Sequence, residues 1–219
     1  MASPTSTAAD AVRRLPKILA LGVLFLVAAA FVAIYVFHYY LNYSPAGFTV
    51  WWPRRFGLLA HITCGTVALL TGPWQFSSRL RRRHLQLHRL MGRAYLIAIA
   101  GGSAAAFYLA FTTVFGWAWG FALASLGLAW VTTSGMAFYA IKQRKIQTHR
   151  EWMIRSYIVT FAFVTFRLLN DWGPTSHLRP VSDRGITVVW ASWALPLLAA
   201  EVILQLRNMR TKPELSALK

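Results

Sequence analysis

Three long stretches of the chain contain no Asp, Glu, Lys or Arg. They run from Ile18 to Pro53, from Phe56 to Ser78 and from Ala94 to Ile141. A helix needs about 20 apolar residues to cross the hydrocarbon core of a bilayer, and the third stretch holds 48 residues, enough for two such helices. Two more apolar segments follow. The pattern predicts an all-α, polytopic transmembrane helix bundle with six spans, at residues 18–41, 56–78, 91–113, 119–141, 151–171 and 186–206.

Composition agrees with this pattern. The 219 residues are 57% hydrophobic and 13% charged, whereas soluble domains are about 25% charged. We expect an N-terminal tail over residues 1–17, the bundle over residues 18–208 and a C-terminal tail over residues 209–219, with residues 116–120 as the turn between the third and fourth spans. The connections are too short for a separate catalytic domain, so any chemistry is expected within the bundle.

The basic residues lie on alternate connections. Of the 23 Lys and Arg residues, 18 fall on the side that holds both tails and 5 on the other. Cytoplasmic loops carry the excess of Lys and Arg, so we expect both termini in the cytoplasm and the chain in the inner (plasma) membrane. This distribution also argues against a nucleic-acid partner, although the net charge is +17. The minority side holds Arg54, Arg55, Arg167, Arg179 and Arg184.

Histidines are the first candidates for chemistry, because ionisable side chains at membrane depth are costly and mark functional sites. With this topology, His88 and His149 share a depth at the cytoplasmic ends of the third and fifth spans, and His61 and His38 share an outer depth. Two imidazoles at one depth on neighbouring helices suit axial ligation of a b-type haem. The single cysteine, Cys64, excludes a disulfide, a Cys-rich metal site and c-type haem attachment.

Glycines stand four residues from these histidines and therefore share their helix faces. Gly57 and Gly65 flank His61, and Gly92 follows His88. A surface without side chains would let a flat macrocycle approach the backbone. Small residues also serve to pack membrane helices, and a His at a helix end can be solvated, so a structural role stays open.

Carboxylates offer a second set of candidates. Glu201 lies within the sixth span, five residues after Pro196, and Arg155 is its expected ion-pair partner. Pro196 leaves the Ser192 carbonyl without its helical partner, and we expect it to kink the helix. Glu201 and Asp171 are the candidate catalytic acids, and Arg93 and Arg155 are the cations expected to meet haem propionates. The last outer loop adds a polar cluster made of Arg167, Asn170, Asp171, His177 and Asp183.

Two separated motifs resemble a known family. The first is HITCGTVALLTGPWQF at residues 61–76, continuing through LRRR at 80–83 to HRLMGRAY at 88–95, and the second is HREWMIRSY at 149–157, ending near FRL at 166–168. Together they resemble the bacterial integral membrane family catalogued as domain of unknown function 2306. Its arrangement of inward histidines is similar to that of the cytochrome b561 and ferric-reductase group, where His pairs between helices hold haems.

That second resemblance implies roles for particular histidines. His88 and His149 match the pair that joins the third and fifth spans, and His61 matches one half of the pair between the second and fourth. The fourth span contains no histidine, so a second haem would need His38 or His177. The resemblance thus implies haem b as cofactor, with metal ligands His88 and His149 and with His61, Arg93 and Arg155 also in the cofactor site.

Three functions remain open from the sequence. The first is a transmembrane b-type haem protein that transfers electrons between quinone, or another membrane redox partner, and an acceptor. The second is a membrane-embedded enzyme acting on a lipid or isoprenoid, with aromatic faces to stabilise cations and Glu201 or Asp171 as proton donor. The third is a non-catalytic subunit of a membrane complex.

Overall fold

The computed structural model describes residues 4–173 and 181–211, and all regular structure within them is helical. Six helical segments among these residues are long and apolar enough to cross a membrane, which confirms the predicted fold class. They are Ile18–Leu41, Pro45–Gln75, Leu85–Phe111, Trp117–Lys142, Ile146–Trp172 and Arg184–Arg210. Large apolar side chains such as Ile97, Phe111 and Leu198 are exposed on them. Such faces need lipid around them, so the chain is an integral, multi-pass membrane protein.

The chain divides into two compact units, Met1–Gly102 and Ser103–Lys219, here called unit 1 and unit 2. Unit 1 contains α1 (Pro4–Phe31), the π-helical η1 (Val32–Val36), α2 (Phe37–Leu41), α3 (Pro45–Phe48), the 3₁₀-helical η2 (Thr49–Arg54), α4 (Arg55–Gln75), α5 (Ser78–Arg83) and the first part of α6 (Leu85–Phe111). Unit 2 contains the rest of α6, α7 (Trp117–Lys142), α8 (Ile146–Thr160), α9 (Ala162–Arg167), the π-helical η3 (Leu168–Trp172) and α10 (Val181–Thr211).

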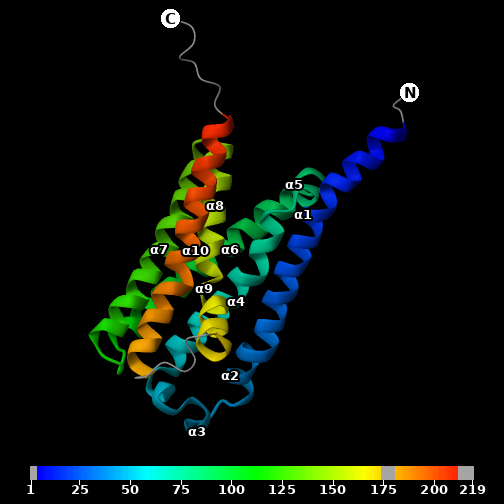
Figure 1. Ribbon diagram of the computed structural model, residues 1–219. Coiled ribbons are helices and arrows are strands. Elements are labelled where there is room, and N and C mark those ends of the chain that lie inside the picture. Colours follow the sequence, from blue (N-terminus) through cyan, green and yellow to red (C-terminus); the bar gives the residue numbers. More distant parts are fainter. Residues whose placement is uncertain (1–3, 174–180, 212–219) are drawn as a thin grey trace, which may run out of the picture. The chain divides into compact units, whose positions relative to one another are not determined.

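In unit 1, α4 is the helix against which the others pack. Helix α1 lies beside it, with Phe25 and Trp74 edge to face at 5.8 Å between ring centroids (Figure 1). The Tyr40 hydroxyl of α2 is 2.6 Å from Thr63 Oγ1. On the α6 side, a methyl group at Gly101 would be 3.2 Å from Cys64 Sγ, so the glycine allows these two helices to approach closely.

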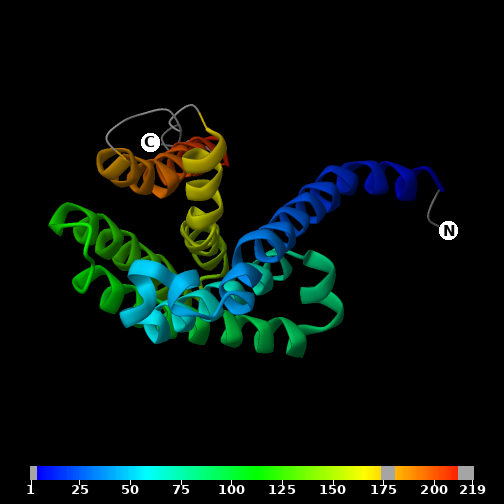
Figure 2. The same ribbon diagram turned by 90° about the horizontal axis from the view of Figure 1, so that it is seen from below.

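In unit 2, α7 and α8 form an antiparallel pair with polar contacts inside it (Figure 1). The buried hydroxyls of Ser134 and Ser156 are 2.7 Å apart. The indole N–H of Trp130 donates to Thr160 Oγ1 at 2.8 Å. Helix α10 packs against α7, α8 and α9, and Figure 2 shows it alongside α9. These hydroxyl and indole contacts satisfy polar groups that would otherwise be costly at membrane depth.

The predicted turn between the third and fourth spans is misplaced by a few residues. Helix α6 ends at Phe111, and the turn ends at Gly116, whose φ of 91° lies in the left-handed region that favours glycine. Trp117, Trp119 and Gly120 therefore belong to the first turn of α7 rather than to the connection.

Candidate functional site

His61 lies on α4 and is half-buried. Its Nδ1 is 2.9 Å from the backbone carbonyl oxygen of Gly102 on α6. A carbonyl oxygen can only accept, so Nδ1 carries the hydrogen and donates it. In the neutral ring the lone pair is then at Nε2, the nitrogen that can bind a metal.

His149 repeats this arrangement in unit 2. It lies in the first turn of α8, and its Nδ1 donates to the carbonyl oxygen of Ala137 on α7 at 2.8 Å. Ala137 is buried, and His149 is half-buried. The ring is thus fixed between two helices, again with Nε2 as the nitrogen that bears the lone pair.

This pattern is the usual one for metal-ligating histidine. Such a ring donates its other N–H to a carbonyl or carboxylate, which sets the tautomer and raises the basicity of the ligating nitrogen. His61 and His149 each have this contact within their own unit. Their donor chemistry therefore fits the ligation of a haem iron by imidazole.

One hydrogen bond of His88 involves its backbone carbonyl and not its ring. It lies in the first turn of α6, where Gln75 at the end of α4 donates from Nε2 to the His88 carbonyl oxygen at 3.4 Å. Gln75 is buried. Because His88 belongs to unit 1 and His149 to unit 2, their joint ligation of one haem stays a prediction.

Gly65 and Gly92, two of the three glycines beside the histidines, have different surroundings. A methyl group at Gly65 would meet no described atom within 4 Å, so the face next to His61 is open, as expected. A methyl group at Gly92 would be 3.3 Å from Gln75 Oε1. The expectation of a bare surface at Gly92 is wrong, because the buried Gln75 amide packs there.

The remaining histidines contribute less. His38 is exposed, and its Nδ1 is 3.0 Å from the side-chain amide nitrogen of Asn42. His84 is exposed at the C-terminal end of α5. His177, the other candidate for a second haem, lies outside the described residues. The part that His38 or His177 would play in a second haem stays a prediction.

The expected ion pair between Arg155 and Glu201 is confirmed. Arg155 on α8 donates from Nε to Glu201 Oε2 on α10 at 2.8 Å, and its Nη2 donates to the same oxygen. The guanidinium also lies over the ring of Trp152, 4.8 Å from its centroid. Arg155 is therefore already neutralised, whereas Arg93 on α6 is exposed. The roles of both as propionate partners stay predictions.

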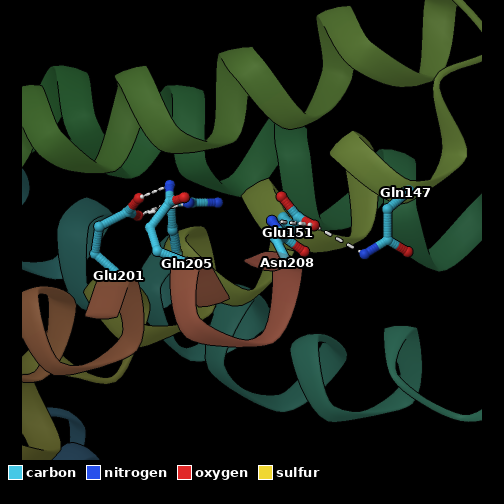
Figure 3. A network of polar contacts seen from close by, with 6 residues as sticks. Gln147, Glu151, Glu201, Gln205 and Asn208 are labelled. Atoms are coloured by element: carbon cyan, nitrogen blue, oxygen red, sulfur yellow. Dashed lines mark hydrogen bonds and ion pairs between the residues drawn. The ribbon is translucent and has the colours of Figure 1, made fainter. Parts of the chain in front are cut away.

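Amide side chains extend this pair into a network between α8 and α10. Gln205 donates to Glu201 Oε1 at 2.8 Å. Nearer the start of α8, Gln147 and Asn208 both donate to Glu151 Oε1, at 2.8 Å and 3.3 Å (Figure 3). The network ties the first turns of α8 to the last turns of α10. It supports a structural role for Glu201, and its use as a proton donor stays a prediction.

The outer polar cluster is present in part. Asp171 is exposed in η3, accepts from the Asn170 amide at 2.7 Å and lies 3.7 Å from Arg167 Nη1. His177 lies outside the described residues, and so does the side chain of Asp183, so the cluster as a whole and the catalytic role of Asp171 stay predictions. Helix α10 continues through Pro196.

No cluster of three or more His, Cys, Asp or Glu side chains able to hold a metal ion occurs in the described parts, residues 4–173 and 181–211. Axial ligation of haem differs from such a site because it needs only two protein ligands per iron. The described parts of the chain thus offer individual anchored imidazoles, such as those of His61 and His149, as candidates for a site.

The comparison with family models decides the membership of this chain. A model described as a predicted membrane protein family, DUF2306, matches residues 58–204, about two thirds of the chain. The chain belongs to the DUF2306 family. No curated protein and no solved structure matches it. The matched region includes His61, His88 and His149, as the motifs had indicated, whereas the likeness to cytochrome b561 stays a prediction.

Two sets of site residues were not foreseen from the sequence. The acceptors for His61 and His149 are backbone carbonyls, which every residue has, so no sequence signal marks them. The amides of Gln147 and Gln205 each stand four residues from a glutamate on the same helix. That spacing brings side chains together on a helix surface, so these two partners could have been found.

Proposed function

We propose that this DUF2306 protein is a b-type haem protein that carries electrons within the membrane, between quinol or a similar reductant and an acceptor. In this proposal His88 and His149 are the axial ligands, and His61 is an outer ligand or a base at a quinone site. The family description gives no activity. The proposal therefore depends on the histidines of this chain.

The observation that carries the proposal is the anchoring of His149, one proposed axial ligand, and of His61, the proposed outer ligand or base, by carbonyls of neighbouring helices. His61 and His149 each donate from Nδ1 to a main-chain oxygen, at 2.9 Å and 2.8 Å. A solvated histidine at a helix end does not need such a contact. The contact selects the tautomer in which Nε2 can bind iron. When bound, haem would supply one-electron redox chemistry, and the protein residues would hold and orient it.

The surroundings of His61 also suit a flat macrocycle. The open face at Gly65 lies one helical turn from His61, with no described atom within 4 Å of a methyl group placed there. Small side chains and glycines let a planar group approach the backbone. This feature supports His61 as a residue of the cofactor site, beside its alternative role as a base.

The test is an absorption spectrum of detergent-purified protein from haem-replete cells, oxidised and then reduced with dithionite. We expect a strong Soret band in wild type that His88→Ala and His149→Ala each abolish. His84→Ala is the matched control, because His84 is exposed and lies only four residues before His88. A colourless wild-type preparation, or equal band intensity in all variants, would refute the proposal.

We also propose that both termini face the cytoplasm. Six spans place the two ends of the chain on the same side of a membrane. In unit 1, the arginine-rich α5 lies at the same end as the N-terminal part of α1 (Figure 1). In unit 2, the Glu151–Asn208 contact brings the basic start of α8 to the basic end of α10. Reporter fusions at residue 219 and at residue 115 should give opposite results, with the cytoplasmic signal at residue 219.

A further inference from the structure

Arg54 and Arg55 are two adjacent cations for which the sequence offers no nearby carboxylate. Residues 11–150 contain no Asp or Glu, so unit 1 has no acidic residue after Asp10. The two arginines lie at the junction of η2 and α4, at the end of α4 opposite to α5. An unpaired charge at a membrane span is costly, and residues 11–150 supply no carboxylate that could act as the counter-charge.

The side chains of both arginines are held in place. The Arg55 guanidinium carbon lies 4.5 Å from the ring centroids of both Trp52 and Phe56, and its Nη1 donates to the Trp52 carbonyl at 3.0 Å. Arg54 donates from Nη1 to the Val50 carbonyl at 3.3 Å. Each guanidinium therefore donates to one backbone carbonyl through its Nη1 group. Both Nε atoms are buried and have no acceptor among the described residues.

The start of α4 adds to the positive potential. Arg54 is the N-cap residue, makes no side-chain cap, and is followed by a first turn without an acidic residue. The N-terminal end of a helix carries partial positive charge and normally favours acidic side chains. Two arginines at this end repel that charge, and a bound anion would relieve the repulsion.

Apolar side chains beside the arginines indicate which anion. Phe56, Val50 and Tyr43 are 68%, 48% and 46% exposed, although Phe56 packs against Arg55 and Tyr43 packs against Trp52. The surface thus combines fixed guanidinium donors with exposed apolar groups at the end of a membrane span. Guanidinium groups bind phosphate through paired N–H donors.

We propose that Arg54 and Arg55 bind the phosphate of a phospholipid with a net negative headgroup, while Phe56, Val50 and Tyr43 contact its glycerol and acyl chains. The site is separate from the histidines, and the proposal does not depend on haem binding. Loss of two charges at a lipid surface is expected to weaken binding roughly 30-fold, since each basic residue contributes about one factor of five.

The test is native mass spectrometry of the full chain titrated with phosphatidylglycerol, with phosphatidylcholine as the zwitterionic comparison. We expect the tightest phosphatidylglycerol adduct of wild type to weaken roughly 30-fold in Arg54→Gln/Arg55→Gln. The control, Arg82→Gln/Arg83→Gln, removes the same charge from α5 and should keep that adduct. Equal weakening in both double variants would show a charge effect without a site and would overturn the proposal.

Two further arms identify the source of the phosphate and guard against misfolding. Inorganic phosphate at millimolar concentration should not displace the lipid from wild type, and displacement would assign the site to a soluble anion instead. Arg55→Lys keeps the charge but loses the paired donors and should weaken the adduct by an intermediate factor. If the double variant Arg54→Gln/Arg55→Lys bound phosphatidylglycerol with wild-type affinity, the proposal would be contradicted. This outcome counts even if Arg54→Gln/Arg55→Gln does not fold.

Discussion

The arginines of the two units differ in what compensates their charge. In unit 2, Arg155 on α8 has an internal carboxylate, Glu201, and an aromatic face, Trp152. In unit 1, Arg54 and Arg55 each donate to a backbone carbonyl, Arg55 also lies over the rings of Trp52 and Phe56, and the sequence from residue 11 to residue 150 supplies no carboxylate. A charge near the membrane can thus be compensated within the protein or by its surroundings. We therefore expect the stability of unit 2 to be sensitive to single substitutions and, from the lipid site proposed above, that of unit 1 to be sensitive to lipid.

The histidines show the opposite relation, because both units hold one in the same way. His61 in unit 1 and His149 in unit 2 each donate to a carbonyl of the next helix. The two units thus differ in how their arginines are compensated but agree in how a histidine is anchored. In our proposal this common histidine contact is the one that serves the function. The following predictions separate stability effects in the two units from that shared feature.

The largest stability effect is expected at the ion pair of unit 2. The Arg155 side chain is 11% exposed and that of Glu201 is 39% exposed, so Glu201→Ala leaves the more deeply buried charge without its partner. We expect a loss of about 2–3 kcal/mol, less than for a fully buried pair because Glu201 is partly solvated. Thermal unfolding in detergent measures it.

A double variant shows how much of that loss comes from leaving one buried charge without its partner. Arg155→Met/Glu201→Leu removes both charges together and should recover most of the loss, since no unpaired charge remains. Arg155→Met alone should cost less than Glu201→Ala, because Glu201 keeps the Gln205 amide and its contact with solvent. A larger loss of stability in Arg155→Met than in Glu201→Ala would contradict the view that Glu201 compensates the buried charge of Arg155 from within the protein.

Glycine packing gives the next effect. In unit 2, a methyl group at Gly120 would lie 2.6 Å from the Ala110 carbonyl oxygen, and we expect Gly120→Ala to cost about 1–3 kcal/mol through overpacking. In unit 1, Gly22→Ala on α1 meets open space and should stabilise by up to about 1 kcal/mol through helix propensity. Unfolding midpoints of equal sign for the two variants would contradict these contacts.

The buried hydroxyl of Thr160 is expected to have a smaller effect. Thr160→Val leaves the buried Trp130 indole N–H without its acceptor, which is 2.8 Å away in wild type. We expect a loss of about 1 kcal/mol, since hydrogen bonds between membrane helices contribute modestly. Thr112→Val is the control, because the Thr112 hydroxyl, directly after α6, donates to the Tyr108 carbonyl at the end of that helix and makes no contact between helices in the described structure. A control that loses as much would assign the effect to the valine rather than to the lost bond.

The smallest effect is the dependence of wild type on added lipid. Phosphatidylglycerol at a free concentration equal to its dissociation constant should stabilise wild type by about 0.4 kcal/mol. Arg54→Gln/Arg55→Gln should lose this response, and Glu201→Ala should keep it. Unfolding curves with and without lipid would show whether the two units respond independently.

Much of the fold could be predicted because apolar length alone decides whether a helix can span a membrane. The first predicted span, residues 18–41, agrees with Ile18–Leu41. The start of α7 could not be placed as well, since hydropathy continues through the turn and the left-handed Gly116 sets the boundary. The π-helical segments Val32–Val36 and Leu168–Trp172 have no glycine or proline to reveal them.

The candidate site was predictable where a rare residue type had few partners. Glu201 is one of only six acidic residues, and matching its depth to Arg155 sufficed to find the ion pair. The carbonyl acceptors of His61 and His149 could not be found this way, because backbone oxygens carry no sequence signature. Gln75, a long side chain from α4, fills the surface at Gly92 on α6. The spacing of residues along one helix cannot predict a contact made by a side chain of another helix.

The haem content of the purified wild-type protein tests the central claim most directly. A pyridine haemochrome measurement on detergent-purified chain from haem-replete cells gives moles of haem b per mole of protein. Our account predicts at least one haem per chain, reduced to none in His149→Ala while His84→Ala retains it. Wild-type protein that folds, carries lipid and contains no haem would contradict the account.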